Sequence, residues 1–240
     1  MLEKNIVITS FDVYPNSVMK PSSLMRYLQQ IAREDCDNMG CTYPFMRSLN
    51  TVFVLTKLAI RFNRPVMAGE SVVLKTYNNS INGIIFDREF ELTSKDEPLA
   101  YASSFWTLVK YDTRSLVRPK DFPVQFEALN YDIEPIFIPR RLPEDGLLVC
   151  ARHTVRTSDL DENNHLNNCV YADIALDSIS EFDGLKKWVS GIKLIFRHEA
   201  KRGDSLIVSR SESGDKTIVF AFNETENKPC FEAELQIDEV

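Results

Sequence analysis

The chain repeats part of itself. Residues 58–75 (LAIRFNRPVMAGESVVLK) align without a gap with residues 192–209 (IKLIFRHEAKRGDSLIVS). Each copy contains an apolar, β-branched run, a turn with glycine, and a second apolar run, which is the pattern of two antiparallel strands joined by a loop. The matched pairs include Phe62 with Phe196, Gly69 with Gly203, Glu70 with Asp204, and Ser71 with Ser205. The repeat therefore predicts two halves of similar fold.

One amphipathic helix is expected ahead of the strands in each half. Apolar side chains recur at helical spacing in residues 21–39 and again in residues 167–182, and a glycine follows each stretch. The later segments of both halves are rich in the β-branched and aromatic residues that favour strands. A long antiparallel sheet has to cover one face, and a helix of this length can do so. We predict an α+β protein, each half a long helix wrapped by an antiparallel sheet.

Residues 118–143 contain five prolines and follow neither the helical nor the strand period. Such a stretch is typical of a connection between structural units. We place the boundary of the two halves just after it, which gives residues 1–144 as the first half with the linker and residues 145–240 as the second half.

Composition excludes several classes of protein. The net charge of −7 and the lack of a long basic run disfavour nucleic-acid binding. The five cysteines are scattered without a C-x-x-C pair, which argues against a disulfide framework or a zinc ribbon. The chain has no run of eighteen apolar residues, which a membrane-spanning helix would need. Its first twenty residues also lack the apolar segment behind a basic end that is typical of a signal peptide. We therefore expect a cytoplasmic protein.

Polar side chains are concentrated in residues 157–168, just before the second predicted helix. Asp161, Asn163 and His165 lie two residues apart, so in an extended chain all three would project from one side. Together they offer an orienting anion, a hydrogen-bond donor for a carbonyl oxygen, and a base that titrates near neutrality. This is a plausible set for hydrolysis.

Other interpretations of this segment exist. Most Asx-rich segments before a helix are polar turns with a helix cap. A calcium loop would use Asp159, Asp161 and Asn163, but Asn164 and Val170 stand where such a loop needs glycine and glutamate. A metal site could be formed from the three histidines, yet no pair has the spacing of ligands on one helix face. Those histidines are His153, His165 and His198.

Comparison of the two halves favours a functional site. Glu199 matches Pro65 in the ungapped repeat, and a looser alignment of the segments before the helices places His165 opposite Val18. Two ionisable side chains of the second half thus stand where the first half has a proline and an aliphatic residue. We infer one polar site in the chain, in its second half.

At these residues the sequence resembles the fatty acyl-acyl carrier protein (acyl-ACP) thioesterases of plants and bacteria, which are tandem hot-dog proteins. Their pattern D-L-D-x-N-x-H-x-N-N-x-x-Y stands here as residues 159–171, and their aromatic–basic–basic–Glu element as residues 196–199. The likeness continues in the first half at residues 69–71, 82–83 and 102–106, so it covers nearly the whole chain.

The resemblance implies hydrolysis of fatty acyl-ACP thioesters without a cofactor or metal. The catalytic set would fall on Asp161, Asn163, His165 and Glu199, with Asp159 as a structural acid. Many relatives have a cysteine, once proposed as a nucleophile, at the position of Ala200. A thiolate mechanism from that position is excluded in this chain, so direct attack by water is expected.

The resemblance also places the acyl chain in the first half. The candidate contacts on its helix are Met25, Leu28, Ile31 and Ala32, although a plain core role would give the same stripe. The partner would be an acidic acyl carrier protein, docked on basic side chains, above all Lys201 and Arg202. Further cations that could take part are Arg114, Arg118, Lys120, Arg140, Arg141, Lys193 and Arg197.

Rival functions are an acyl-CoA thioesterase, a dehydratase of 3-hydroxyacyl chains, and a non-catalytic acyl-binding protein. The last would not need His165 and Glu199. A monomer and a homodimer both stay open, since two such units in one chain imitate a dimer while free sheet edges can pair.

Overall fold

The computed structural model describes residues 1–126 and 135–240. The helices are α1 (Pro21–Asn38), α2 (Tyr43–Ser48) and α3 (Asn168–Asp177), with 3-10 turns at Pro119–Asp121 and Thr157–Asp159. The strands of the first half are β1 (Leu2–Val7), β2 (Thr51–Phe62), β3 (Ser71–Asn82), β4 (Ile85–Ser94) and β5 (Glu97–Lys110). Those of the second half are β6 (Leu148–Thr154), β7 (Lys187–Phe196), β8 (Ser205–Ser213), β9 (Lys216–Asn223) and β10 (Lys228–Glu239).

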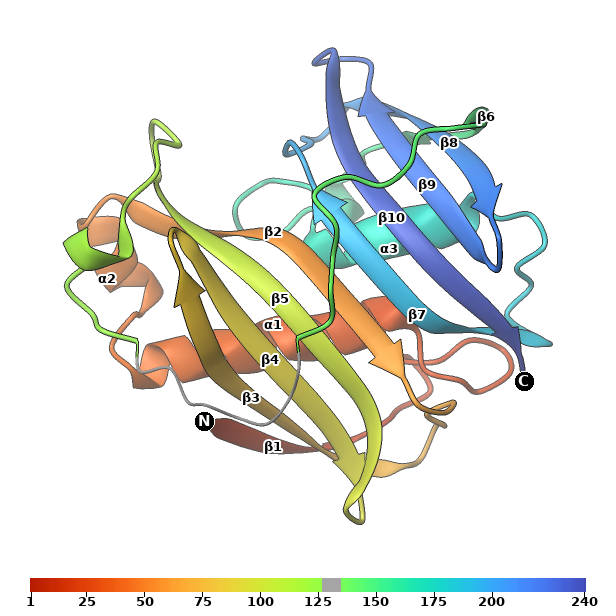
Figure 1. The fold of residues 1–240 in the computed structure, drawn as a ribbon, viewed down its shortest axis with the longest axis horizontal. Coiled ribbons are helices and arrows are strands. Elements are labelled where there is room, and N and C mark those ends of the chain that lie inside the picture. The colour runs from red at the N-terminus through yellow and green to blue at the C-terminus, as the bar shows by residue number, and fades with distance from the viewer. Residues whose placement is uncertain (127–134) are drawn as a thin grey trace.

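Within the described residues all strands belong to one antiparallel sheet, in the order β1-β3-β4-β5-β2-β7-β10-β9-β8-β6 (Figure 1). The two halves meet where β2 pairs with β7. These strands are the equivalent first strands of the repeat, and the ladder pairs Leu58 with Leu194 and Ile60 with Ile192. Because Leu58 is equivalent to Ile192 and Ile60 to Leu194, this pairing has the self-complementary form of a two-fold dimer interface.

Both long helices lie on the same face of the sheet (Figure 1). α1 and α3 contact each other, and apolar residues of both helices and both halves form one continuous core. The predicted α+β architecture is confirmed. α3 is shorter than expected, because the chain turns at Ser178, whose hydroxyl donates to the Ala175 carbonyl (2.6 Å). Phe182, beyond this turn, packs edge-on against Tyr14 of the first half.

The residues shared by the two copies of the repeat build the same turn twice. Gly69 and Gly203 have φ values of +87° and +90°, which side-chain-bearing residues rarely adopt. The acidic residue that follows each glycine accepts a backbone hydrogen bond three residues back: Glu70 from Met67 (2.6 Å) and Asp204 from Lys201 (2.9 Å). The shared positions therefore specify fold, and they do not mark a second polar site.

The described end of the predicted linker crosses the face of the sheet opposite the helices (Figure 1). Ile138 and Leu142 pack there against Ala59 and Ile195, and the Leu142 N–H donates to the buried carboxylate of Glu232 (2.8 Å). Residues 127–134, which also fall within the predicted linker, lie outside the described residues. Since one sheet runs through both halves, the boundary at residues 144 and 145 stays a prediction.

The sequence patterns did not predict β1, α2 or β6, which are all short. β1 and β6 are the edge strands, and β6 has exposed residues that hide its strand pattern. Among the described residues, no helix combines the length and the apolar character needed to cross a membrane.

Candidate active site

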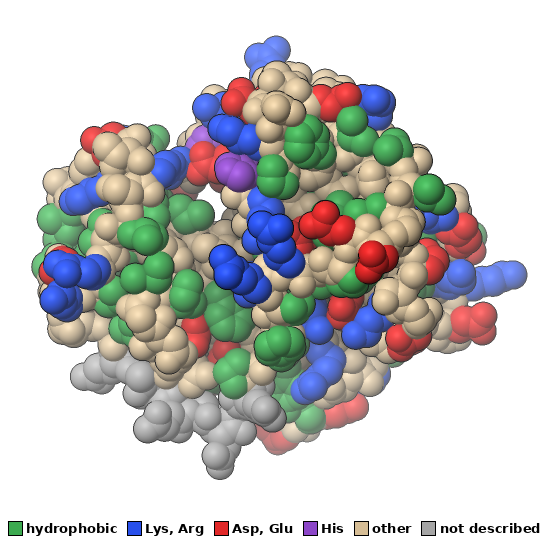
Figure 2. All heavy atoms as spheres, turned by 45° about the horizontal axis from the view of Figure 1, so that its top comes forward, with side chains coloured by type: hydrophobic (Ala, Val, Ile, Leu, Met, Phe, Trp, Pro, Cys, Tyr) green, Lys and Arg blue, Asp and Glu red, His purple; other side chains and the backbone are tan. Residues whose placement is uncertain are grey.

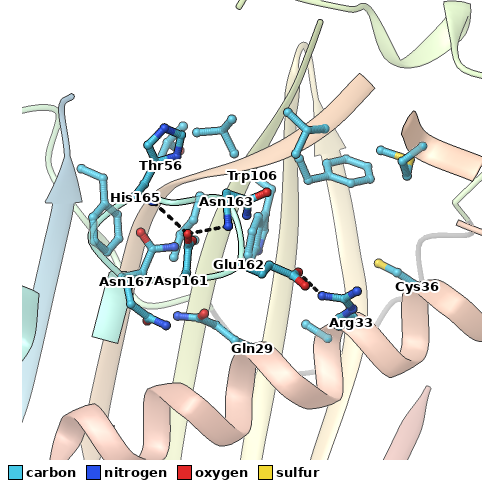
Figure 3. A pocket seen from close by; sticks show the side chains of 18 of the residues that line it. Gln29, Arg33, Cys36, Thr56, Trp106, Asp161, Glu162, Asn163, His165 and Asn167 are labelled. Carbon is cyan, nitrogen blue, oxygen red and sulfur yellow. Dashed lines mark hydrogen bonds and ion pairs between the residues drawn. The ribbon is translucent and has the colours of Figure 1, made fainter. Parts of the chain in front are cut away.

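A cleft of about 690 Å³ opens between α1 and the sheet and is lined by residues of both halves. Figure 2 shows histidine and acidic side chains beside a hollow in the surface. His165 and Asp161 lie at one end and Cys36 at the other (Figure 3). Near Cys36 the walls belong to an apolar cluster that includes Cys41, Met46, Phe53, Phe86 and Phe126. The cleft thus joins a polar end to an apolar chamber.

The polar end is built by a tight loop between Leu160 and Leu166, which form an isolated bridge. Asp161 organises this loop, because its Oδ1 accepts hydrogen bonds from the N–H groups of Asn163 (2.8 Å) and His165 (3.1 Å). Its own N–H donates to the His165 carbonyl (2.8 Å). Asn164 adopts a left-handed φ of 61°, which asparagine tolerates. The segment is therefore a turn, and the extended chain assumed from the spacing is not formed.

His165 faces Glu199 across the cleft. Its Nε2 lies 3.2 Å from Glu199 Oε2, and its side chain is mostly buried at 19% exposure, whereas Glu199 is 39% exposed. The Arg114 Nη2 lies 2.8 Å from Oε1 and 3.1 Å from Oε2 of the same carboxylate. The Leu166 N–H donates to the Ala200 carbonyl (2.8 Å), which ties the segment after β7 that carries Glu199 to the loop of His165. The structure therefore brings together the two ionisable side chains that the comparison of the halves singled out.

Asn163 also lines the cleft, on the same loop as His165 (Figure 3). Its Oδ1 is buried and has no hydrogen-bond partner among the described residues. A buried amide oxygen without a partner costs roughly 1–3 kcal/mol. The Asn163 amide thus brings both an acceptor, Oδ1, and a donor, Nδ2, to the polar end of the cleft.

The backbone N–H groups at the start of α3 also lie at the polar end of the cleft, and one of them is already bonded. The Asn167 N–H already donates to the Asp159 carbonyl (2.9 Å), and the Asn167 side chain accepts from the Cys169 N–H (3.0 Å). The N–H of Asn168, the first residue of α3, is therefore the candidate backbone donor to a substrate at this end of the cleft.

The other polar residues of the segment have local structural partners. Asp159 Oδ2 accepts from the Arg156 N–H (2.8 Å) and lies 3.1 Å from His153 Nε2. His198 contacts the Pro229 carbonyl through Nδ1 (2.9 Å). The three histidines thus have three different partners, and the described part of the chain contains no group of three ligands that could hold a metal.

Cysteine chemistry does not fit the site. Ala200 is fully buried, and Cys169, a thiol that lines the cleft, is buried in the first turn of α3. Burial raises the pKa of the Cys169 thiol to about 12, so it stays protonated at neutral pH. Its sulfur instead accepts a hydrogen bond from Gln29 of α1 (3.2 Å).

The candidate acyl contacts divide into two groups. Ala32 lines the cleft, while Met25, Leu28 and Ile31 are buried in the main core and do not line it. The α1 stripe faces the sheet, and the cleft runs along a neighbouring side of the helix that includes Gln29, Arg33 and Cys36. The structure therefore moves the candidate chain slot away from those three residues to the apolar cluster beyond Cys36.

The two predicted docking residues, Lys201 and Arg202, are exposed and follow Ala200 directly. They lie outside the residues that line the cleft. Sequence reasoning counted Arg114 only as a possible docking cation, and it missed the contact with Glu199. No sequence signal joined these residues, which lie 85 positions apart in the two different halves.

Replacing Asp161 by alanine should loosen the loop more than the fold. The variant loses two backbone hydrogen bonds to an ionised group, each worth about 1.5–3 kcal/mol. We expect faster hydrogen exchange at the Asn163 and His165 amides, with exchange in β7 and β10 unchanged. Equal exchange at the loop amides in both proteins would contradict the structural role assigned to Asp161.

Known proteins match the chain along its length. The family model for the acyl-ACP thioesterase N-terminal domain matches residues 2–123, and that for the acyl-ACP thioesterase C-terminal domain matches residues 148–238. The palmitoyl-acyl carrier protein thioesterase of Gossypium hirsutum is 25% identical over 243 residues, which cover 93% of this chain and 57% of that protein. The chain thus spans little more than half the length of this curated relative.

Solved structures share the fold. An acyl-ACP thioesterase from Bacteroides thetaiotaomicron superimposes with a TM-score of 0.88 at 21% identity, covering 99% of this chain and 97% of the other. The 12:0-ACP thioesterase from Umbellularia californica gives a TM-score of 0.82 at 18% identity, covering 100% and 97%. With both halves matched by the family models and the whole fold shared, the chain belongs to the acyl-ACP thioesterase family.

Proposed function

We propose that the protein hydrolyses fatty acyl-ACP thioesters and releases the free fatty acid. The observation that carries this proposal is the His165–Glu199 pair, with 3.2 Å between Nε2 and Oε2, at the polar end of an otherwise apolar cleft. An imidazole and a carboxylate in this arrangement can take a proton from water, and the adjoining apolar chamber suits an alkyl chain. The relatives' names point to the same reaction.

In the proposed mechanism, Glu199 and His165 take a proton from a water molecule, whose oxygen attacks the thioester carbonyl. Asn163 Nδ2 and the Asn168 N–H stabilise the carbonyl oxygen as it gains negative charge. The tetrahedral intermediate then collapses, the carbon–sulfur bond breaks, and the thiolate of the carrier's prosthetic group leaves. The leaving sulfur takes up the proton held by the His165–Glu199 pair, so no covalent enzyme intermediate is required.

The acyl chain would lie in the apolar chamber. Ala32, Cys41, Met46, Phe53, Phe86 and Phe126 supply its walls. Burial of an alkyl chain there is favoured by about 0.8 kcal/mol for each methylene group removed from water. This slot lies in the first half of the chain, whereas the acid–base pair comes from the second.

Product analysis on matched thioesters tests the proposal. Acyl-ACP and acyl-CoA of the same chain length are incubated with the protein, and the products are separated and identified. Free fatty acid formed faster from acyl-ACP supports the proposed activity, while preference for acyl-CoA favours the first alternative. An enoyl product would indicate a dehydratase, and tight binding without turnover would indicate a non-catalytic acyl-binding protein.

Carrier docking is proposed on Lys201 and Arg202. Both are exposed beside the strand end that bears Glu199, and an acidic carrier would meet complementary charge there. Reversing both charges (Lys201→Glu with Arg202→Glu) should raise KM for acyl-ACP at least several-fold and leave KM for acyl-CoA nearly unchanged. Equal changes for the two substrates would place docking elsewhere.

A cytoplasmic location and a homodimer are further proposals. All five cysteines are free in the structure, as expected in a reducing compartment, although the curated relatives are named chloroplastic. The edge strand β6 exposes Leu148 and Val149, which a second copy could cover. Cell fractionation and sedimentation velocity would decide these two points.

A further inference from the structure

The contact between Arg114 and Glu199 joins the two halves of the chain at the reacting end of the cleft. One guanidinium nitrogen of Arg114, Nη2, lies 2.8 Å from Oε1 and 3.1 Å from Oε2. Oε2 in turn lies 3.2 Å from His165 Nε2. The Glu199 carboxylate is therefore held between a cation of the first half and the imidazole of the second.

Arg114 occupies an unusual backbone position for this contact. It lies in the turn after β5 at a φ of +56°, where glycine or asparagine would be accommodated more easily. The turn is closed by hydrogen bonds from the Arg114 N–H to the Lys110 carbonyl (3.0 Å) and from the Val117 N–H to the Leu108 carbonyl (2.9 Å). A long side chain kept at a strained position in a well-bonded turn points to a role for the side chain itself.

Tyr111 restrains the arginine from the side. The Arg114 guanidinium carbon lies 5.6 Å from the centre of the Tyr111 ring, and that of Arg47 from α2 stacks on the same ring at 3.2 Å. The Tyr111 N–H is bonded to the Asn50 carbonyl (2.9 Å), so the ring is anchored to the chain just before β2. Arg114 is thus limited in the directions it can take.

We propose that Arg114 is a positioning residue, which fixes the Glu199 carboxylate in the orientation where Glu199 and His165 act on one water molecule. Both members of the ion pair are 39% exposed, so their attraction adds little to the stability of the fold. The ion pair instead fixes the orientation of the Glu199 carboxylate, and a small misplacement of a reacting group lowers the rate steeply. This role rests on the proposed hydrolase function and adds to it that the site is completed by the first half.

The main competing role for Arg114 is docking of the acidic carrier, and kinetics separate the two. A docking residue changes KM for acyl-ACP and leaves acyl-CoA hydrolysis unaffected. A positioning residue changes kcat for both thioesters to the same extent, because the carboxylate it orients acts on both.

The experiment compares Arg114→Met with wild type on acyl-ACP and acyl-CoA of one chain length. We expect kcat to fall roughly ten- to a hundredfold for both thioesters, with little change in either KM. Arg114→Lys should recover part of the loss, since an ammonium can meet the carboxylate without the planar geometry of arginine. The matched control is Arg152→Met, an exposed arginine of β6 that pairs with Glu224 away from the cleft, and it should behave as wild type.

A second measurement tests whether Arg114 acts through Glu199. Adding Arg114→Met to Glu199→Gln should cause no further loss of kcat, because the group that Arg114 orients no longer works. A further tenfold loss of kcat in the double variant, or an Arg114→Met effect on KM for acyl-ACP alone, overturns the positioning role. The proposed hydrolase function still stands in that case, provided that the wild-type protein releases fatty acid. A wild-type protein that releases no fatty acid from either thioester overturns the proposed function and this role with it.

Discussion

Replacing His165 with alanine should lower kcat/KM for acyl-ACP by two to four orders of magnitude, the usual contribution of a general base. The ring is mostly buried and its Nε2 faces Glu199 at 3.2 Å, so in the proposed mechanism His165 is the group that shares the proton with the carboxylate. Initial rates of fatty acid release measure the loss. Glu199→Gln, which keeps the size of the side chain and removes its charge, should give a loss of similar order.

The rate losses caused by the two substitutions should not be additive. If His165 and Glu199 act as one acid–base unit, the double variant is about as slow as the slower single variant. His198→Ala is the matched control. This histidine also lines the cleft and precedes Glu199 in the sequence, but its ring contacts the backbone carbonyl of Pro229. A folded His165→Ala protein with more than a tenth of the wild-type rate would show that the acid–base role belongs to another group.

The repeat is the reason why the architecture of the two halves could be predicted, apart from the short elements β1, α2 and β6. A pattern present twice reveals which positions serve folding: the turn glycines Gly69 and Gly203 and the acids after them form the same turn in each half. The same comparison isolated His165 and Glu199, because they match an aliphatic residue and a proline. Side chains that differ between otherwise equivalent positions therefore supplied the acid–base pair of the proposed mechanism.

The course of the cleft and the contacts of Asp161 could not be predicted from such patterns, for physical reasons. Helical periodicity tells which face of α1 is apolar, but Met25, Leu28 and Ile31 fill the core, and the cleft runs along a side that periodicity marks as polar. Spacing placed Asp161 beside its neighbours, whereas its contacts with the amides of Asn163 and His165 depend on a turn. Long-range contacts such as Arg114 with Glu199 exist only after the two halves have paired.

Replacing Asp35 with leucine should destabilise the fold more than any other single change considered. Asp35 of α1 and Arg88 of β4 form a buried ion pair, with Oδ2 and Nη1 2.8 Å apart and side chains exposed by only 8% and 5%. Removing one partner of such a pair leaves an uncompensated buried charge and costs about 3–5 kcal/mol of unfolding free energy. Urea denaturation measures this cost as a shift of the midpoint at constant slope.

Two further variants separate the buried charge from the loss of contacts. Replacing both residues (Asp35→Leu with Arg88→Met) removes the charge as well and should restore most of the stability, because apolar pairs of similar volume are tolerated at such sites. The control is Lys4→Ala, which breaks an exposed ion pair between Lys4 of β1 and Glu34 of α1. It should lower the unfolding free energy by no more than about 1 kcal/mol. Arg88 also donates to Thr76 (3.0 Å) and Asn78 (2.8 Å). If Asp35→Leu unfolds at the wild-type urea concentration, these two neutral acceptors must be sufficient to hold the guanidinium between α1 and the sheet.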